Sequence, residues 1–129
     1  MTQRHIRHGQ GAVRPYVYCY ADTIELVHKA FGAQEVERVP MGSGFHIEAR
    51  IGDSMIVLEV GEPAPAGATR ASIYVYVDDV DQSFSTALKL GAVAISQPED
   101  KPYQERGAGI SDRFGNTWWI ATYIGGVSR

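Results

Sequence analysis

A repeat within the chain is the feature that most restricts what this sequence can fold into. Three short stretches recur, in the same order and with slowly increasing offsets, in the second half of the 129 residues. Such a pattern predicts two copies of one supersecondary unit that stack to share a core. The recurring pairs are YCYAD at 18–22 with YVYVD at 74–78, Gly-Ala at 32–33 with 91–92, and IGDSMIVL at 51–58 with FGNTWWIA at 114–121.

Each copy is predicted to contain a strand, a helix and three further strands. The first strand alternates aromatic and β-branched residues, and the helix keeps apolar residues at helical spacing before a Gly-Ala pair. Acidic residues near 22 and 79 suit the helix starts, and Gly52-Asp53 and Gly115-Asn116 suit tight hairpin turns. The predicted strands are 16–20, 35–39, 45–51 and 54–60 in the first copy, and 73–77, 93–97, 106–112 and 117–123 in the second.

The predicted fold class is therefore α+β, with two tandem βαβββ units forming a curved mixed sheet around a cleft. Unit one covers residues 14–60, a Pro/Gly/Ala-rich linker covers 61–70, and unit two covers 71–124. Residues 1–13 are polar and are predicted to form a flexible N-terminal arm. A chain of this length is the size of one domain.

The alternation of the strands assigns side chains to two faces of the sheet. One set is apolar and should pack on the helices, including Cys19 as a buried thiol and Trp118 beside Ile120. The other set should line the cleft, with a polar stripe of His46, Glu48 and Arg50 on the strand 45–51. The aromatic residues of that second set are Tyr16, Tyr18, Tyr20, Tyr74, Tyr76, Trp119 and Tyr123.

Composition excludes several classes of function. Fifteen acidic against twelve basic residues give a net charge of -3, which disfavours a nucleic-acid partner held by phosphate contacts. No apolar run reaches the ~20 residues of a membrane span, and the single cysteine cannot form an intrachain disulfide. We therefore expect a cytoplasmic protein that binds neither nucleic acid nor membrane.

The paired βαβββ pattern resembles the vicinal oxygen chelate superfamily, which includes glyoxalases, bleomycin resistance proteins and extradiol dioxygenases, and within it the PhnB-like glyoxalase-like group. The resemblance covers about residues 14–124. The stretches that carry it are RPYV at 14–17, KAFGAQEV at 29–36, FHIEARIGDSMIVL at 45–58, IYVYVDDVD at 73–81, YQERGA at 103–108 and DRFGNTWWIAT at 112–122.

Enzymes of this superfamily usually hold a divalent metal on the first and last strands of each unit. The corresponding positions are Arg14 or Tyr16, Ser72, Trp119, and one of Ile56, Leu58 or Glu59 depending on register. A guanidinium repels a cation and an indole offers no lone pair, so these residues predict no metal ligands and no cofactor. A divalent-metal glyoxalase- or dioxygenase-type enzyme stays as an alternative.

The resemblance and the aromatic face together predict a protein that binds, and sequesters, an aromatic or amphipathic small molecule. The expected ligand-binding residues are Tyr16, Tyr18, Tyr74, Tyr76, Tyr103, Arg106 and Trp119.

Three alternatives stay open at this point. One is a lyase or isomerase acting next to a carbonyl, with His46 and Glu48 as the acid/base pair and Arg106 or Arg50 as an anion clamp. In another, the loop containing Asp100, Tyr103, Glu105 and Arg106 forms a lid. The third is an interaction module whose aromatic residues fill its own cleft. The resemblance also implies a homodimer.

Overall fold

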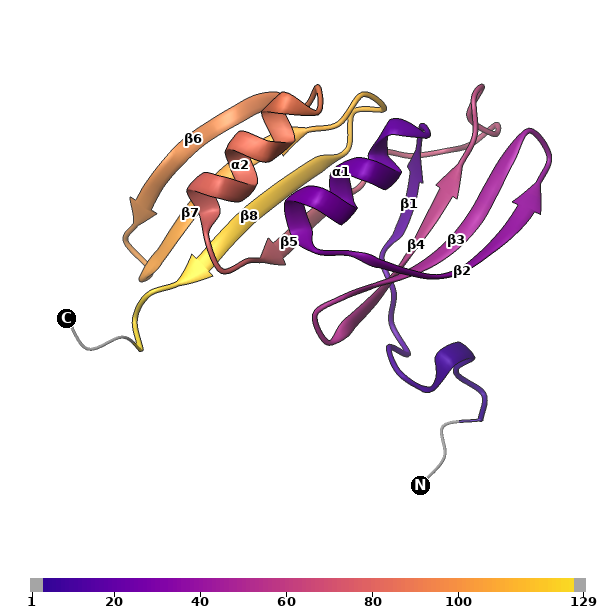
Figure 1. Cartoon of the computed structure of the whole chain (residues 1–129), viewed down its shortest axis with the longest axis horizontal. Coiled ribbons are helices and arrows are strands. Elements are labelled where there is room, and N and C mark those ends of the chain that lie inside the picture. Colours follow the sequence, from indigo (N-terminus) through magenta and orange to yellow (C-terminus); the bar gives the residue numbers. More distant parts are fainter. Residues whose placement is uncertain (1–3, 127–129) are drawn as a thin grey trace.

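The chain folds into two four-stranded sheets that lie side by side, with α2 (Val80–Lys89) on the second sheet and α1 (Asp22–Phe31) beside it near the junction of the sheets, in a computed structural model that describes residues 4–126 (Figure 1). The first sheet has the strand order β1-β4-β3-β2 and the second β5-β8-β7-β6. In both, the first and last strands of the unit run parallel and the remaining pairs are antiparallel. The two predicted βαβββ units are therefore confirmed.

The first unit contains β1 (Tyr16–Cys19), α1 (Asp22–Phe31), β2 (Gln34–Met41), β3 (Gly44–Ile51) and β4 (Ser54–Val60). The second contains β5 (Ser72–Tyr76), α2 (Val80–Lys89), β6 (Val93–Lys101), β7 (Glu105–Ser111) and β8 (Thr117–Tyr123). A 3-10 turn, η1 (Arg7–Gly9), precedes them. The strands β2 and β6 extend further than the sequence predicts, and β7 begins one residue earlier.

Both helices end where the sequence places a glycine. Gly32 has φ 74° and Gly91 has φ 99°, the left-handed region that glycine enters without a steric penalty. At the helix starts the two units differ, because the Asp79 carboxylate accepts a hydrogen bond from the Gln82 N–H while α1 has no side-chain cap. No helix among residues 4–126 is long and apolar enough to cross a membrane.

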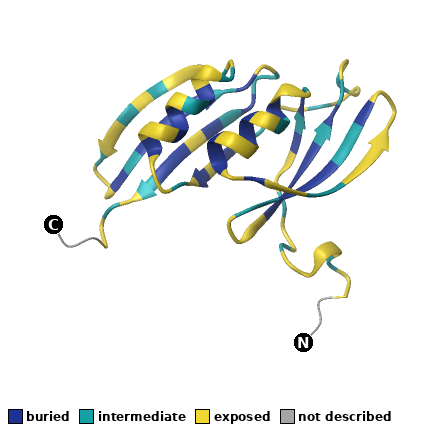
Figure 2. Ribbon diagram, viewed as in Figure 1, coloured by how far each residue is buried: buried dark blue, intermediate teal, exposed yellow. Residues whose placement is uncertain are grey.

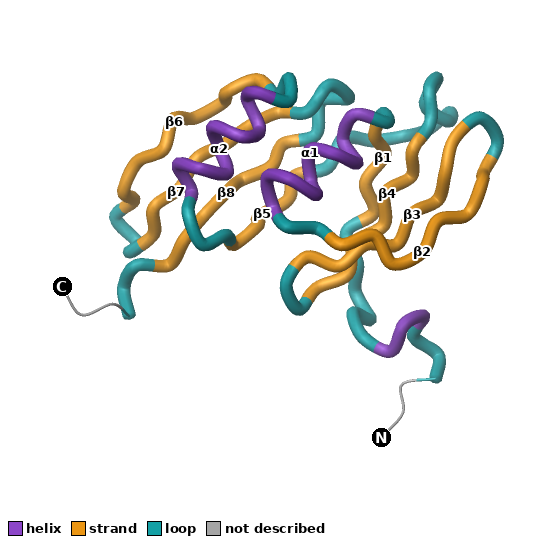
Figure 3. The backbone as a smooth tube through the Cα atoms, in the orientation of Figure 1, coloured by secondary structure: helices purple, strands orange, loops and turns teal. Residues whose placement is uncertain are grey.

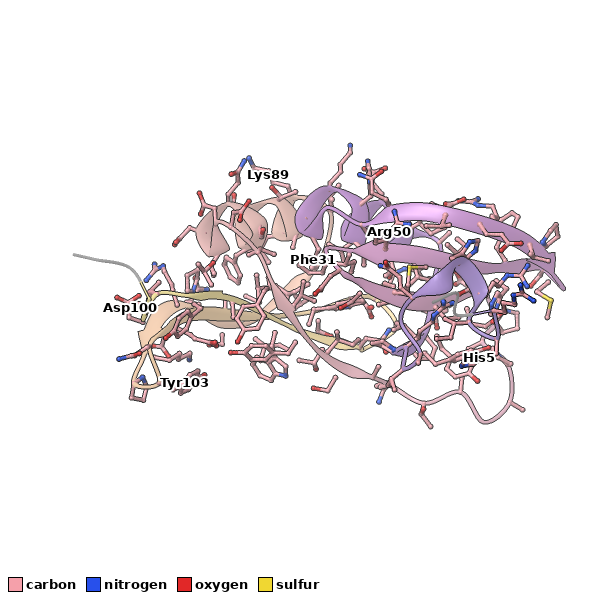
Figure 4. All side chains as sticks on the ribbon, turned by 90° about the horizontal axis from the view of Figure 1, so that it is seen from below. His5, Phe31, Arg50, Lys89, Asp100 and Tyr103 are labelled. Atoms are coloured by element: carbon pink, nitrogen blue, oxygen red, sulfur yellow. The ribbon has the colours of Figure 1, made fainter. Side chains whose placement is uncertain are left out.

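The helices cover the same side of both sheets, and the core lies between helices and sheets (Figures 2 and 3). The predicted division of faces is confirmed: Trp118 and Ile120 are buried against the helices, whereas Trp119 is 36% exposed on the other side. We call that other side the helix-free face. In the edge-on view of Figure 4, Lys89 lies on the helix side and Tyr103 on the helix-free side.

A buried polar network fixes the two units to each other. The Asp112 carboxylate accepts hydrogen bonds from the Asn116 amide and from the Trp118 indole at 2.9 and 3.0 Å. The same Asn116 amide donates to the Tyr18 carbonyl of β1 at 2.8 Å, which joins unit two to unit one. Because Asn116 is fully buried, its satisfied hydrogen bonds specify how the two sheets meet.

Candidate functional site

A cluster of polar side chains lies on the helix-free face of the first sheet. His46 is its centre: Nδ1 lies 2.7 Å from a Glu59 oxygen and Nε2 lies 2.5 Å from a Glu48 oxygen. The Tyr16 hydroxyl donates to the same Glu59 oxygen at 2.8 Å. Strand register produces this cluster, because His46 pairs with Glu59 across β3 and β4 and directly paired residues share a face.

Glu59 lies on the helix-free face, which decides which of Ile56, Leu58 and Glu59 occupies the ligand position expected on β4. Aligned by its recurring sequence, β4 would present Ile56 where β8 presents Trp119. Because α1 begins at residue 22 and α2 at residue 80, the structure matches Tyr16 to Tyr74, and not Tyr18 to Tyr74 as the recurring YCYAD and YVYVD do. In this match Tyr16 pairs with Val57 and Tyr74 pairs with Trp119, so β4 is displaced by one residue from the repeat that aligns Ile56 with Trp119. This slip moves Glu59 onto the helix-free face, whereas Ile56 and Leu58 are buried.

The two carboxylates determine the protonation of their neighbours. The hydrogen bond to Glu59, followed by that to Glu48, raises the pKa of His46 above its usual value although burial opposes the change. The hydrogen bond to Glu59 raises the pKa of Tyr16 to about 12. His46 is therefore favoured as a cation and Tyr16 as a neutral phenol.

Arg14 compensates the buried carboxylate of Glu48. Its Nη1 donates to Glu48 Oε1 at 2.6 Å, and both side chains are mostly buried. The same guanidinium also donates to the Gly11 carbonyl at 2.8 Å, the Gln10 carbonyl at 2.9 Å and the Arg7 carbonyl. Arg14 thereby ties the chain around η1 to the polar cluster.

Part of the segment predicted as a flexible arm, residues 7–11, contacts the first sheet; residues 1–3 lie outside the described part. Arg7 forms a two-pronged ion pair with Glu37 of β2 at 2.7 and 2.5 Å, and His8 contacts the same carboxylate at 2.9 Å. Gly11 packs so closely on Met55 that an added Cβ would lie 2.9 Å from the Met55 Cβ. Met55 is consequently fully buried, although it faces away from the helices.

Aromatic side chains dominate the helix-free face of the second sheet. Tyr74, Tyr103 and Trp119 line a hollow of about 310 Å³ together with Ser96 and Lys101. Gly107 forms part of its floor, and a Cβ there would meet its neighbours only at ordinary contact distances of 3.5 Å or more. By contrast, a Cβ on Gly109 would lie 2.7 Å from the Trp119 ring, so the indole takes the space of the missing side chain.

Glu105 lies beneath these rings, and we did not expect it there. It is the first residue of β7 and is only 7% exposed, and its two oxygens accept hydrogen bonds from the hydroxyls of Tyr74 and Tyr76. Those hydrogen bonds raise the pKa of both tyrosines, so the hydroxyls stay protonated. Its alternation with Gly107 in β7 is the sequence signal that could have placed it on this face.

Arg106 does not join the other predicted ligand-binding residues. It lies on the helix side of β7, where it donates to Asp81 of α2 at 2.8 and 2.9 Å and to Asp100 at 3.1 Å. Adjacent strand residues point to opposite faces, so Glu105 and Arg106 cannot both line the same hollow. Tyr18 does lie beside Tyr16, with ring centroids 5.3 Å apart, and Tyr76 lies beside Tyr74 at 5.6 Å.

A second hollow of about 310 Å³ connects the two sheets on the helix-free face. Val13 and Pro15 line it from the N-terminal segment, and Tyr74 and Tyr76 line it from β5. Tyr74 therefore borders both hollows. A larger hollow of about 520 Å³ lies beside α1 on the helix side, and none of the predicted site residues lines it.

The polar cluster does not fit a divalent metal ion. The two nitrogens of His46 contact different carboxylates, which therefore lie at opposite ends of the ring rather than around one point. The Arg14 guanidinium occupies one oxygen of Glu48, and the Trp119 indole donates to the Ser72 hydroxyl at 3.0 Å. Among residues 4–126, no group of three His, Cys, Asp or Glu side chains is arranged to hold a metal ion.

Comparison with known proteins gives one family and uncharacterized relatives. Residues 13–120 match the family described as the glyoxalase/bleomycin resistance protein/dioxygenase superfamily. An uncharacterized protein of Mycobacterium bovis is 33% identical over 110 residues, which cover 76% of this chain and 72% of that protein. An uncharacterized protein of Mycobacterium tuberculosis is also 33% identical, but there the match spans only 65% of the relative.

Solved structures share the fold at low identity. TioX from Micromonospora sp. ML1 is 22% identical with a TM-score of 0.67, covering 92% of this chain and 99% of TioX. The fosfomycin resistance protein FosX from Listeria monocytogenes is 14% identical with a TM-score of 0.65, covering 88% and 93%. A glyoxalase/bleomycin resistance protein/dioxygenase family enzyme from Burkholderia phytofirmans PsJN is 21% identical with a TM-score of 0.66, covering 84% and 97%.

Proposed function

Since the chain belongs to the glyoxalase/bleomycin resistance protein/dioxygenase superfamily, we propose that it binds an aromatic or amphipathic small molecule without the help of a metal ion. The observation that carries this proposal is the hollow lined by Tyr74, Tyr103 and Trp119 over Gly107. Ring faces stack on flat ligands, and small-molecule sites combine such apolar walls with a few polar groups. Ser96 and Lys101 supply polar groups at the edge of this hollow.

The arrangement of donors supports the metal-free part of the proposal. The residues at the family's usual ligand positions include a guanidinium and an indole N–H, which cannot coordinate a cation. The polar cluster is also already saturated internally, because His46 and Glu48 use their ring nitrogens and carboxylate oxygens on each other and on Glu59 and Arg14. Binding and sequestration need no such coordination.

Titration of tryptophan fluorescence with 1-naphthylmethanol tests the binding function. Trp119 borders the hollow while Trp118 is fully buried in the core, so we expect saturable quenching that disappears in Trp119→Phe. Trp119→Ala should weaken binding measured by calorimetry about fivefold, on the order of one lost stacking contact of ~1 kcal/mol. Tyr123→Ala is the matched control, because Tyr123 is exposed on the same strand and does not line the hollow. Equal affinity of wild type and Trp119→Ala would contradict the proposal.

As a second candidate we propose proton transfer next to a carbonyl, and the observation that favours it is His46 held between two carboxylates. Because its pKa is raised, His46 would protonate the developing enolate oxygen while Glu48 removes the proton from the adjacent carbon, and the reverse transfers would return both protons. Deuterium exchange into hydroxyacetone, followed by NMR, tests this: His46→Gln should abolish exchange, and Arg38→Gln, at an exposed ion pair of β2, should leave it unchanged. Exchange that survives in His46→Gln would rule out this role.

We also propose that the protein forms a homodimer, as the resemblance implies. Tyr16, Tyr76 and Tyr123 are each about half exposed on the helix-free face, which leaves apolar surface that a second copy could cover. Light scattering coupled to size-exclusion chromatography should give twice the monomer mass of 14.1 kDa. A mass that stays at the monomer value across micromolar concentrations would contradict it.

A further inference from the structure

The two sheets each bury one carboxylate on the helix-free face, but among residues 4–126 only one of these carboxylates has a cationic partner. Glu48 is 5% exposed and contacts both Arg14 and His46. Glu105 is 7% exposed and contacts the hydroxyls of Tyr74 and Tyr76, and it forms no ion pair with any residue between 4 and 126. A buried anion without a counter-ion is unfavourable, and two neutral hydroxyls only partly offset its desolvation.

The basic side chains nearest to Glu105 are engaged elsewhere. Lys101 pairs with Glu105 across β6 and β7 and lines the same hollow, but its ammonium is bound to Glu99 at 2.6 Å. Arg106 lies on the other face of the strand and is bound to Asp81 and Asp100. On the helix-free face, the adjoining ends of β6 and β7 therefore carry the positive charge of Lys101 and the negative charges of Glu99 and Glu105. One negative charge remains in excess.

Aromatic rings surround that excess charge. Tyr74, Tyr103 and Trp119 line the hollow, and Tyr76 shares the carboxylate with Tyr74. The faces of such rings carry negative electrostatic potential and attract a cation within about 6 Å of the centroid. A carboxylate hydrogen-bonded behind the phenols acts in the same direction, since its field adds to that of the rings.

From these observations we infer that the ligand of the second sheet is an organic cation, an ammonium or amidinium group attached to a flat apolar body. The cationic group would lie over the rings of Tyr74 and Trp119, near enough to Glu105 to offset its charge. The apolar body would lie over Gly107, where the absent side chain leaves a hollow of about 310 Å³, the size of a small ligand. This inference rests on the proposed binding function and specifies its ligand class.

Calorimetric titration with three matched probes tests the inference. The probes are 1-naphthylmethylammonium, the neutral 1-naphthylmethanol and the anionic 1-naphthoate, which share one ring system. At low ionic strength we expect the ammonium to bind about tenfold more tightly than the alcohol, and the naphthoate to bind more weakly than the alcohol.

Two charge variants identify the source of the preference. Glu105→Gln should reduce the advantage of the ammonium over the alcohol to threefold or less. Lys101→Met removes the opposing positive charge and should strengthen binding of the ammonium about threefold. Glu25→Gln, in an exposed ion pair on α1, is the control and should change neither affinity. If Glu105→Gln does not fold, as judged by circular dichroism, Lys101→Met decides the question.

The outcomes separate this inference from the proposed function. Equal binding of the ammonium and the alcohol overturns the cation preference. An advantage that is unchanged in the charge variants that fold overturns its assignment to Glu105 and Lys101. Both outcomes leave binding of aromatic molecules standing. Binding of none of the three probes overturns both. Preferential binding of the naphthoate would show that Lys101, rather than Glu105, determines the ligand charge.

Discussion

The helix-free faces of the two sheets differ although the units that form them repeat. In the first sheet the N-terminal segment lies over Met55, and its buried carboxylate is paired with Arg14 and His46. In the second sheet Ser72 stands where the first has Arg14. Gly107 and Gly109 of β7 stand where β3 has His46 and Glu48, as the strand pairings show. The same scaffold thus supports a saturated polar cluster in one half and an open aromatic surface in the other.

This contrast shows how a duplicated fold acquires one binding surface rather than two. A face whose polar groups bond to one another offers a ligand few unsatisfied partners, because each new contact must replace an existing one. A face with exposed rings and an uncompensated carboxylate keeps its interactions available. We therefore expect ligands on the second sheet and structural roles for most of the cluster on the first.

The largest expected effect on stability concerns Glu48, the buried carboxylate that is paired with Arg14. Arg14→Met removes the cation beside buried Glu48, so the free energy of unfolding in urea should fall by roughly 3 kcal/mol, the cost of breaking a buried ion pair. Ser72→Ala, at the corresponding position of the second unit, should cost less than about 1 kcal/mol. If Arg14→Met lowered the free energy of unfolding by less than about 1 kcal/mol, the Arg14–Glu48 pair would not stabilise the first unit.

The second largest effect should be the difference in stability lost when each buried carboxylate, Glu48 or Glu105, is replaced by an amide. Glu48→Gln leaves Arg14 and His46 without their anion, so we expect a loss of about 2 kcal/mol in the free energy of unfolding. Glu105→Gln removes a charge that has no cationic partner in the described part of the chain, so we expect a change of less than about 1 kcal/mol in either direction. Similar losses for the two variants would contradict the distinction between the faces.

The pH dependence of stability should come from the first sheet. The pKa of His46 is raised in the folded chain by Glu59 and Glu48, so its protonated form stabilises the fold. This contribution is fully present below the ordinary histidine pKa of 6.5 and is lost as pH rises through the higher pKa of the folded chain. Urea denaturation between pH 5.5 and 9 should show the decline, and His46→Gln should remove it. An unchanged slope in His46→Gln would assign the dependence to another group.

The smallest effect on stability should come from the contact that holds the N-terminal segment. Arg7 and Glu37 form an exposed pair, and such pairs contribute little to the free energy of unfolding. Arg7→Ala should therefore leave global stability unchanged but speed amide hydrogen exchange in residues 7–9, the part of the segment that this pair holds near β2. Arg38→Ala, which breaks an exposed pair on the same strand, should leave that exchange unchanged.

Several features of the site could be predicted from short-range patterns. The alternation of residues 72–76 and 117–123 places Tyr74, Tyr76 and Trp119 on the face away from the helices, and the structure agrees. The same alternation brings His46 and Glu48 to one side of β3. These predictions hold because a strand's period of two depends only on neighbouring residues.

Other features depend on which strands and segments meet in space. Glu59 faces His46 because β4 is shifted by one residue relative to the repeat, and a shift of one reverses every side chain. Alternation could place Glu105 and Arg106 on opposite faces of β7, but only the fold brings the hydroxyls of Tyr74 and Tyr76 to Glu105 and Asp81 of α2 to Arg106. Arg14 reaches Glu48 across 34 residues of sequence.

Taken by itself, the sequence determined that two βαβββ units would form and which rings would avoid the core, because repeats and alternation are properties of adjacent residues. Tertiary structure alone decided which of the two buried carboxylates would have a cation beside it. That outcome depends on distances between charged groups far apart in the chain, and Coulomb interactions become strong only when folding brings such groups into contact and excludes water.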